Sequence, residues 1–199
     1  MRQAYSTLSA QYIGLLDGGW QEHADDTELV RRHLSGLAGR VLDLGCGPGH
    51  WTAWLHSLGA QVTGVDMVPE FVSHARTTYP GVEFQLGSMT DLRLPAHSAA
   101  GLLSWYSTIH VPPTDIDRVL AGFRRLLGAS GVLVIGFFDS DDTVAAFDHA
   151  VATAYRWPAD AFSERLSEAG LTEVDRFRHR RPERSDRRYA AIAARASAG

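Results

Sequence analysis

Arg40-Val-Leu-Asp-Leu-Gly-Cys-Gly-Pro-Gly-His50 is the stretch that decides the fold of this chain. Its first residues are mostly apolar and predict a buried parallel strand. Three glycines follow at every second position, and they allow a tight turn in which a ligand approaches the backbone closely. Residues 51–58 then place Trp51, Trp54 and Leu55 at helical spacing. Strand, glycine turn and helix start together predict a loop that binds a nucleotide-type cofactor, because the free N–H groups of a helix start attract negative ligand atoms.

A carboxylate inside this loop argues against a dinucleotide. The glycine spacing is G-x-G-x-G, whereas the dinucleotide fingerprint is G-x-G-x-x-G and requires a third glycine where this chain has His50. Asp43 precedes the first glycine by two residues, where it would repel a pyrophosphate and suit a ligand with an ammonium group. S-adenosylmethionine (SAM) carries such a group and no phosphate. The alternative is that Asp43 only caps the turn and that the glycines only make it tight.

A second acidic residue, Asp66, lies 21 residues after Gly45, at the end of a predicted strand over residues 61–66. An acid at the tip of the second strand of such a unit accepts hydrogen bonds from both ribose hydroxyls. The alternative is that Asp66 caps the next helix, which we expect to begin near Pro69.

Length and composition limit the classes of protein to consider. The chain has 199 residues, which fits one domain, and a net charge of -4, which gives no general attraction to nucleic acid. Its single cysteine, Cys46, excludes an intrachain disulfide and favours a reducing cytoplasm. The sequence shows neither a signal peptide nor an apolar run long enough to span a membrane.

Strands and helices are predicted to alternate, which indicates a doubly wound α/β sheet. We expect strands over residues 41–44, 61–66, 82–86, 100–104, 132–138, 171–177 and 188–194. Helices are expected over residues 3–16, 26–37, 51–58, 69–78, 114–127 and 159–169. A short helix is predicted over residues 144–152. The last two strands are joined by a short connection and should therefore be antiparallel to each other.

The segment after the fourth strand contains the candidate catalytic residues. In such folds ligands bind at the carboxyl ends of the strands, and residues 105–110 leave the sheet there. Trp105 and Tyr106 are predicted to wall the pocket. His110 titrates near neutrality and is predicted to act as a general base, with Tyr106 shaping the pocket beside it. The alternatives are simple packing for the aromatic residues and a backbone-bonded structural role for His110.

Several features occur in the order found in one family: the loop 43–49, Asp66, Gly87-Ser88-Met89, the segment 105–110 and a C-terminal hairpin. Together they resemble the class I SAM-dependent methyltransferases, and the resemblance covers residues 5–194. It implies a Rossmann-like fold with a seven-stranded mixed sheet in the order 3-2-1-4-5-7-6 and helices on both faces. It also implies a single domain over residues 1–199, with residues 1–35 as a helical lid and residues 40–195 as the core.

The resemblance implies SAM as the cofactor and S-adenosylhomocysteine as its product. The cofactor-binding residues would be Tyr5, Tyr12, Asp43, Gly45, Cys46, Gly47, Gly49, His50, Asp66, Met67, Gly87, Ser88, Met89, Trp105 and Tyr106. Substrate contacts are assigned to Trp105, Tyr106, His110, Tyr155 and Trp157. The family often has Asp where this chain has Ser88, so only backbone contacts to the adenine are expected there. No metal site is expected, because the acid that a catechol-type site needs after the fourth strand is missing.

The expected reaction is transfer of a methyl group to an O or N atom of a small molecule. One alternative is a methyltransferase acting on RNA or protein, which the acidic net charge and the missing Asn-Pro-Pro motif disfavour. Another is a SAM-binding protein without transfer activity. An NAD enzyme is disfavoured by Asp43 and His50.

Two charged segments raise further expectations. Residues 176–188 hold seven arginines and two acids and form either a solvated hairpin tip or, with Arg180 and Arg181, a surface that attracts an anionic substrate. Asp139, Asp141 and Asp142 are interpreted as a solvated turn, with a metal site as the alternative. The sequence predicts no membrane partner and does not indicate an oligomeric state.

Overall fold

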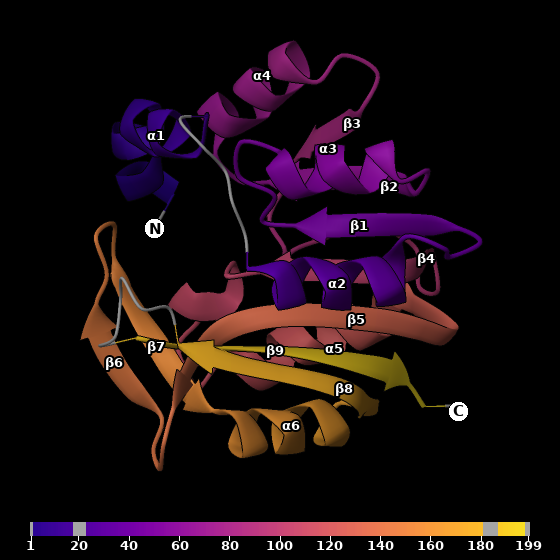
Figure 1. The fold of residues 1–199 in the computed structure, drawn as a ribbon, viewed down its shortest axis with the longest axis vertical. Coiled ribbons are helices and arrows are strands. Elements are labelled where there is room, and N and C mark those ends of the chain that lie inside the picture. Colours follow the sequence, from indigo (N-terminus) through magenta and orange to yellow (C-terminus); the bar gives the residue numbers. More distant parts are fainter. Residues whose placement is uncertain (1, 18–22, 181–186, 198–199) are drawn as a thin grey trace.

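Helices and strands alternate along the chain, and strands form the centre of the molecule (Figure 1). The computed structural model describes residues 2–17, 23–180 and 187–197. Within these ranges the strands are β1 (Arg40–Leu44), β2 (Gln61–Asp66), β3 (Glu83–Leu86), β4 (Ala99–Trp105), β5 (Leu127–Ser140), β6 (Ala145–Asp148), β7 (Thr153–Pro158), β8 (Leu171–Arg180) and β9 (Arg188–Ala196). The helices are α1 (Arg2–Asp17), α2 (Ala24–Leu34), α3 (His50–Ser57), α4 (Pro69–Thr78), the short 3₁₀ helix η1 (Thr108–His110), α5 (Ile116–Leu126) and α6 (Ala159–Glu168).

The main sheet has the predicted topology. β3, β2, β1, β4 and β5 are parallel neighbours in this order, and β9 and β8 extend the sheet beyond β5. β9 is antiparallel to both β5 and β8, so β8 runs parallel to β5. With β8 as the sixth and β9 as the seventh strand of the family order, this is the order 3-2-1-4-5-7-6. The described residues add β6 and β7, which makes nine strands where seven were predicted.

The helix predicted over residues 144–152 is wrong, because β6 and β7 form a hairpin there. β4 ends at Trp105, opposite Gly136, so the last residues of β5 have no partner on that side from β4. β7 fills this place, with Phe138 opposite Arg156 in a parallel pairing. The alanine-rich sequence favours a helix locally, but the open edge of β5 favours a strand, and the tertiary contact prevails.

Alternation along the strands builds two cores, one on each face of the sheet. Val132 and Val134 of β5 pack under α2 and α3, whose Leu34 and Leu55 are fully buried. The intervening residues Leu133, Ile135 and Phe137 face the opposite way, toward α5 and α6. Figure 1 shows α2 and α3 in front of the sheet and α5 behind it. The two N-terminal helices therefore differ, because α2 belongs to the core layer and α1 does not.

The carboxyl ends of the parallel strands point to one side of the molecule. In Figure 1 the arrowhead of β1 is directed toward the side where α1 and the β6–β7 hairpin lie. The chain runs from β1 outward through β2 to β3, and then returns to β4 on the other side of β1. β1 and β4 therefore flank the point at which the strand order reverses, where ligands bind in open α/β sheets. Among the described helices there is none with the length and apolar character that a membrane crossing needs.

Candidate functional site

Two buried carboxylates hold the loop between β1 and α3. Asp43, on β1, is 1% exposed and accepts a hydrogen bond of 2.6 Å from the hydroxyl of Thr52. Asp66, at the end of β2, accepts the backbone N–H of Gly47 with one oxygen and that of Val68 with the other, both at 2.9 Å. Asp66 thus fastens the loop to β2 and also supports the start of α4. Because each carboxylate oxygen has two lone pairs, capacity remains for ligand hydroxyls.

The first two loop glycines serve different purposes. A Cβ on Gly45 would lie 2.3 Å from the Cβ of Ser107, so this glycine lets the loop press against the segment after β4. Gly47 has a φ of +53°, and a Cβ there would meet nothing within 4 Å. Its bare backbone therefore faces open space, where a ligand can approach. Gly49 lies at the start of α3, packed against Phe84, and lines neither of the cavities described next.

Two neighbouring cavities meet at this loop. The Asp66 cavity has a volume of about 130 Å³ and the Asp43 cavity about 230 Å³. Six of the predicted residues line both, which makes the two cavities parts of one cleft: Tyr5, Tyr12, Gly45, Gly47, Trp105 and Tyr106. The Asp66 cavity also contains Asp66, Met67, Gly87, Ser88, Met89 and His110, and the Asp43 cavity also contains Asp43, Cys46 and His50.

The cleft is acidic at its floor. Burial raises the pKa of Asp43 to about 7, hydrogen bonds from Thr52 partly offset this rise, and the charge of Asp66 adds to it. Burial also raises the pKa of Asp66. Among the described residues that line the two cavities there is no arginine, although the chain has 19. Two buried carboxylates without a fixed cation favour a ligand that brings its own positive charge.

The loop after β3 presents backbone rather than side-chain groups. The hydroxyl of Ser88 is bonded within the loop, to the hydroxyl of Thr90 at 2.8 Å. Met89 packs against the main core and extends its methyl group toward Gly45. The peptide N–H of Gly87 donates to the backbone carbonyl of Asp66 at 2.9 Å, which anchors the loop to β2. The side-chain hydroxyl of Ser88 is thus engaged within the loop, and the contact of main-chain groups of Ser88 and Met89 with an adenine stays a prediction.

Tyr106 adopts an unusual backbone conformation where β4 ends. Its φ is +51°, a region that costs a residue with a Cβ about 1–3 kcal/mol. Its N–H donates to the carbonyl of Gly136 at 3.0 Å, and its ring lies 5.2 Å from that of Phe138 and 5.9 Å from that of Tyr189. The turn therefore directs the Tyr106 ring toward the end of β5.

His110 is bonded on both ring nitrogens. Its Nδ1 lies 2.8 Å from the carbonyl oxygen of Thr153, and its Nε2 lies 2.8 Å from the hydroxyl of Tyr5. A carbonyl only accepts, so Nδ1 carries the proton and Nε2 of the neutral ring accepts from Tyr5. Burial lowers the pKa of His110, while the bond to Thr153 acts in the opposite direction. Burial raises the pKa of Tyr5 above its ordinary value. His110 is thus neutral near pH 7, and its proton-accepting atom faces α1.

α1 covers the cleft through its aromatic residues. The ring of Tyr5 lies 5.8 Å from that of Tyr12, and both contact Phe71 of α4, at 6.0 and 5.4 Å. The hydroxyl of Ser6 donates to the carboxylate of Glu70 nearby. Both tyrosines are among the predicted cofactor-binding residues, and they line the same cleft as Gly45 and Gly47. The larger lid over residues 1–35 stays a prediction.

Two predicted substrate residues lie away from the cleft. The indole of Trp157 is in the main core, 5.5 Å from the ring of Phe162, and Tyr155 packs against the same core. Neither lines the Asp43 or the Asp66 cavity. β7 places them on the face of the sheet that α5 and α6 cover, and this follows from the hairpin that the sequence did not reveal.

Cys46 and His50 line the Asp43 cavity as predicted. Burial raises the pKa of the Cys46 thiol, and its sulfur packs toward Gly64 of β2. A protonated thiol in this position supplies shape rather than a nucleophile. The ring of His50 lies 6.1 Å from that of Tyr79.

The lining residues that sequence reasoning missed include Phe138, Tyr189 and His149. Phe138 stands at the end of β5, and the rule that located Trp105 after β4 would have found it. Tyr189 lies at the start of the antiparallel β9, and His149 lies in the β6–β7 hairpin. Their positions depend on strand pairings that no local sequence signal indicates.

The arginine-rich segment contributes to a third cavity. Arg180, Arg187 and Arg188 line it together with Phe138 and residues of the β6–β7 hairpin, and its volume is about 500 Å³. We call it the arginine cavity. Residues 181–186, and with them Arg181, lie outside the described part of the chain.

The interpretation of Asp139 as part of a solvated turn is wrong. Its side chain is 2% exposed and accepts one hydrogen bond from Nε of Arg178, at 2.9 Å, and one from the backbone N–H of Ala159. Its Oδ2 also forms an ion pair with Nη2 of Arg178, at 2.8 Å. It lies on β5, under the end of β8, because β5 continues past the predicted limit. Within the described ranges no group of three or more metal-ligating side chains is present.

The comparisons agree with this geometry. A family model described as a methyltransferase domain matches residues 41–131, which contain the glycine loop and Asp66. The crystal structure of a 1,6-didemethyltoxoflavin-N1-methyltransferase from Burkholderia thailandensis, with S-adenosylhomocysteine bound, is 25% identical. The match covers 100% of this chain and 91% of that one, with a TM-score of 0.76. The chain thus has the fold of the class I SAM-dependent methyltransferases, and its residues 41–131 match the methyltransferase-domain model.

Curated relatives of this chain are similar over part of their length. The ubiquinone biosynthesis O-methyltransferase of Xanthomonas oryzae is 38% identical over 133 residues, which are 64% of this chain and 54% of that protein. A probable SAM-dependent methyltransferase of Mycobacterium tuberculosis is 30% identical over 48% of this chain and 34% of its own length. The chain therefore spans about half the length, or less, of these relatives.

The residues of the cleft fit SAM, the cofactor of the proteins that the chain resembles. SAM carries a sulfonium and an ammonium group, and the cleft offers two buried carboxylates and no arginine among its described lining residues. Gly47 leaves the space above its backbone open. Asp66 keeps lone pairs for hydroxyl donors, and Met89 provides an apolar surface beside the loop after β3. The same acidic floor would repel the pyrophosphate of NAD.

Proposed function

We propose that this chain transfers the methyl group of SAM to an oxygen or nitrogen atom of a small molecule. The observation that carries the proposal is the acidic, arginine-free cleft, in which α1 covers the glycine loop while the end of β5 stays open toward a further cavity. One ligand would occupy the acidic part, and a second would approach from the β5 end.

The chain's own residues would divide the work of holding the cofactor. Asp66 would accept hydrogen bonds from the ribose hydroxyls, and Asp43 would balance the positive charge at the other end of the cleft. Backbone groups at Ser88 and Met89 would face the adenine. SAM supplies an activated methyl carbon that bonds to the acceptor's lone pair as its bond to sulfur breaks and leaves the electron pair on sulfur. The chain then mainly has to align the two reactants and exclude water.

The acceptor's proton is the one further requirement. We assign its removal to the pair of Tyr5 and His110, because Nε2 of the neutral His110 already accepts from the Tyr5 hydroxyl. The Tyr5 oxygen would take the acceptor's proton as its own proton moves to Nε2, so Tyr5 ends unchanged and His110 becomes charged. The bond from Nδ1 to the carbonyl of Thr153 stabilises that charged form.

Two comparisons support a small acceptor. The toxoflavin-precursor methyltransferase, whose match covers the whole chain, has a small heterocycle bound. The Xanthomonas relative is named for methylation of an oxygen in ubiquinone biosynthesis. They differ in the acceptor atom, so we keep both oxygen and nitrogen in the proposal.

Binding and transfer are tested separately. Titration calorimetry on the whole chain should show saturable binding of SAM and S-adenosylhomocysteine and none of NAD. Methyl-labelled SAM is then incubated with a panel of hydroxylated and amine-bearing metabolites, and products are identified by mass spectrometry.

Asp66→Ala is the control for that screen, because it should weaken cofactor binding and lower product formation together. Labelled product that the wild type forms, and that Asp66→Ala forms more slowly at limiting SAM, would support transfer. Tight SAM binding without any product would support the alternative of a SAM-binding protein, and binding of NAD but not SAM would overturn the cofactor assignment.

A further inference from the structure

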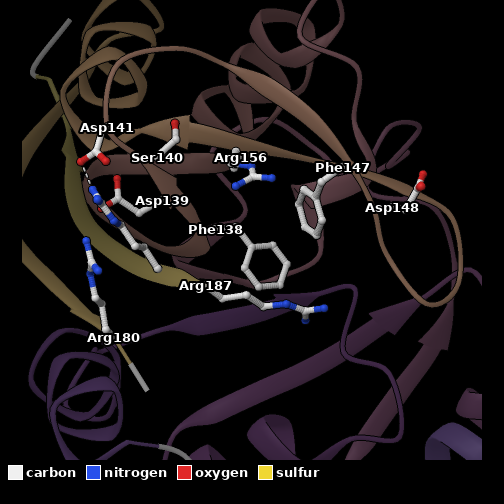
Figure 2. A pocket seen from close by; sticks show the side chains of 10 residues that line it. Phe138, Asp139, Ser140, Asp141, Phe147, Asp148, Arg156, Arg180 and Arg187 are labelled. Carbon is white, nitrogen blue, oxygen red and sulfur yellow. Dashed lines mark ion pairs between the residues drawn. The ribbon is translucent and has the colours of Figure 1, made fainter. Parts of the chain in front are cut away.

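The arginine cavity lies directly beyond the Asp43 cavity. Phe138, at the end of β5, lines both. The walls come from the β6–β7 hairpin on one side and from the facing ends of β8 and β9 on the other. Figure 2 shows the rings of Phe138 and Phe147 in the cavity with the guanidinium groups of Arg156 and Arg187 on either side. With about 500 Å³, its volume lies within the range of small-molecule sites.

The acids of this cavity are largely neutralised by arginines. Asp139 accepts a hydrogen bond from Nε of Arg178 and forms an ion pair with the same guanidinium, and Asp141 forms an ion pair with Arg188. Asp148, the remaining acidic residue among the described lining, is exposed at the end of β6. The other lining residues therefore carry an excess of positive charge, which comes from arginines.

Arg156 is the cation best placed to meet a ligand. It lies on β7, opposite Phe138 of β5, and its guanidinium carbon is 5.2 Å from the centre of the Phe147 ring. Its Nε is buried without a hydrogen-bond partner among the described residues. Arg187 stands over the other ring, 5.7 Å from the centre of Phe138. A buried guanidinium N–H that lacks an acceptor is costly, and an anion supplies that acceptor in fork geometry.

The two phenyl rings complete the recognition surface. Phe138 and Phe147 meet edge to face, with centres 5.2 Å apart. Such a pair offers ring faces and edges against which a flat molecule packs. The surface also leads toward the reaction site, since the Phe138 ring contacts that of Tyr106 in the cleft.

We propose that the arginine cavity binds the anionic end of the methyl acceptor, a carboxylate, phosphate or sulfate on an aromatic or other planar body. Arg156 is the anchor for the anion, Phe138 and Phe147 hold the planar body, and the acceptor atom extends past Phe138 into the Asp43 cavity. This inference rests on the proposed function for the direction of the acceptor atom. All residues of the arginine cavity follow position 131, so they lie outside the stretch that the family model matches.

The experiment measures binding with simple probes on the whole chain, with S-adenosylhomocysteine present. The probes are 4-hydroxybenzoate, phenyl phosphate and the neutral 4-hydroxybenzamide. Calorimetry and saturation-transfer NMR measure their binding. We expect the two anions to bind about 10- to 100-fold more tightly than the amide, because a hydrogen bond to a charged group contributes about that factor to the binding constant. A difference between the two anions would show which anionic group the cavity prefers.

Arg156→Gln should abolish the preference for the anions and leave the amide unchanged. The matched control is Arg93→Gln, whose side chain is 89% exposed on a loop outside the cavity, and it should behave as the wild type. If Arg156→Gln does not fold, the salt dependence of the wild type replaces it, because added salt should weaken the anions selectively. The proposal would be overturned by equal affinity for the anions and the amide, by an anion preference that is unchanged in Arg156→Gln, or by no detectable binding of either anion.

These outcomes separate the inference from the proposed function. Anion binding needs no methyl transfer, so it can be found even if labelled SAM gives no product. Conversely, a product from a neutral acceptor, with no binding of the anionic probes, would leave the proposed function standing and remove the anionic substrate class.

Discussion

Replacing Asp43 by asparagine tests the electrostatic design of the cleft. Asp43 has a pKa of about 7, against about 4 for an Asp in an unfolded chain. The folded state therefore holds the proton more tightly, and the free energy of unfolding falls as the pH rises from about 4 to about 7. At 1.36 kcal/mol per pKa unit, the loss is about 4 kcal/mol above pH 7 and about a third of that at pH 5.

The Asp43→Asn side chain carries no charge and can still accept the hydrogen bond from Thr52. The ligand-free variant should be more stable than the wild type, by up to about 4 kcal/mol at pH 8.5 and by about a third of that at pH 5. Urea unfolding at both pH values measures the difference. Asp91→Asn, whose side chain is 73% exposed, is the matched control and should change neither value.

The same substitution should weaken SAM binding, because the cationic ligand favours the ionised carboxylate. In the wild type at pH 6, binding should release up to about one proton, which calorimetry in buffers of different ionisation heat detects. The variant should release fewer protons. An Asp43→Asn variant that is less stable than the wild type at pH 8.5, or SAM binding without proton release, would refute the reasoning.

Three further predictions concern the residues around the loop. His110→Ala and Tyr5→Phe should each lower kcat by about 10²- to 10⁴-fold and leave the affinity for SAM nearly unchanged. His110→Ala should also remove the acidic limb of the pH profile of kcat/KM, which lies below pH 6.5 because burial lowers the pKa of His110. A wild-type kcat in either variant would contradict the assigned proton transfer. Gly45→Ala should lower the free energy of unfolding by about 2–5 kcal/mol and Tm by about 5–15 °C, because a Cβ there enters occupied space at positive φ. The control Gly36→Ala, which places its Cβ in open space, should leave Tm within about a degree of the wild type. Asp66→Ala should weaken SAM and S-adenosylhomocysteine by about 1.5–3 kcal/mol in calorimetry, and unchanged affinity would place the ribose elsewhere.

The central part of the fold could be predicted because its determinants are local. The β1 strand, the glycine turn and Asp66 lie within one short stretch, and hydrophobic periodicity gives the elements around them. The rule that ligands bind at the carboxyl ends of parallel strands then brought Asp43, Asp66 and Trp105 to one cleft, where the structure places them.

The parts that could not be predicted depend on distant partners. The hydrogen bond between Tyr5 and His110 joins residues 105 positions apart, and neither local sequence indicates that the two side chains meet. Asp139 is buried because Arg178, 39 positions later, neutralises it. The hairpin of β6 and β7 depends on the unpaired end of β5, which is visible only once the whole sheet is assembled.

That hairpin also affects how such a protein can change in evolution. It enters the chain between β5 and α6, after the cofactor-binding strands, and it pairs with the last residues of β5. Its residues can therefore be exchanged or lengthened without altering the glycine loop or either buried carboxylate. Acceptor choice and cofactor use then become separately inherited traits, and a chimaera that carries another family member's hairpin should take that member's acceptor while keeping its own affinity for SAM.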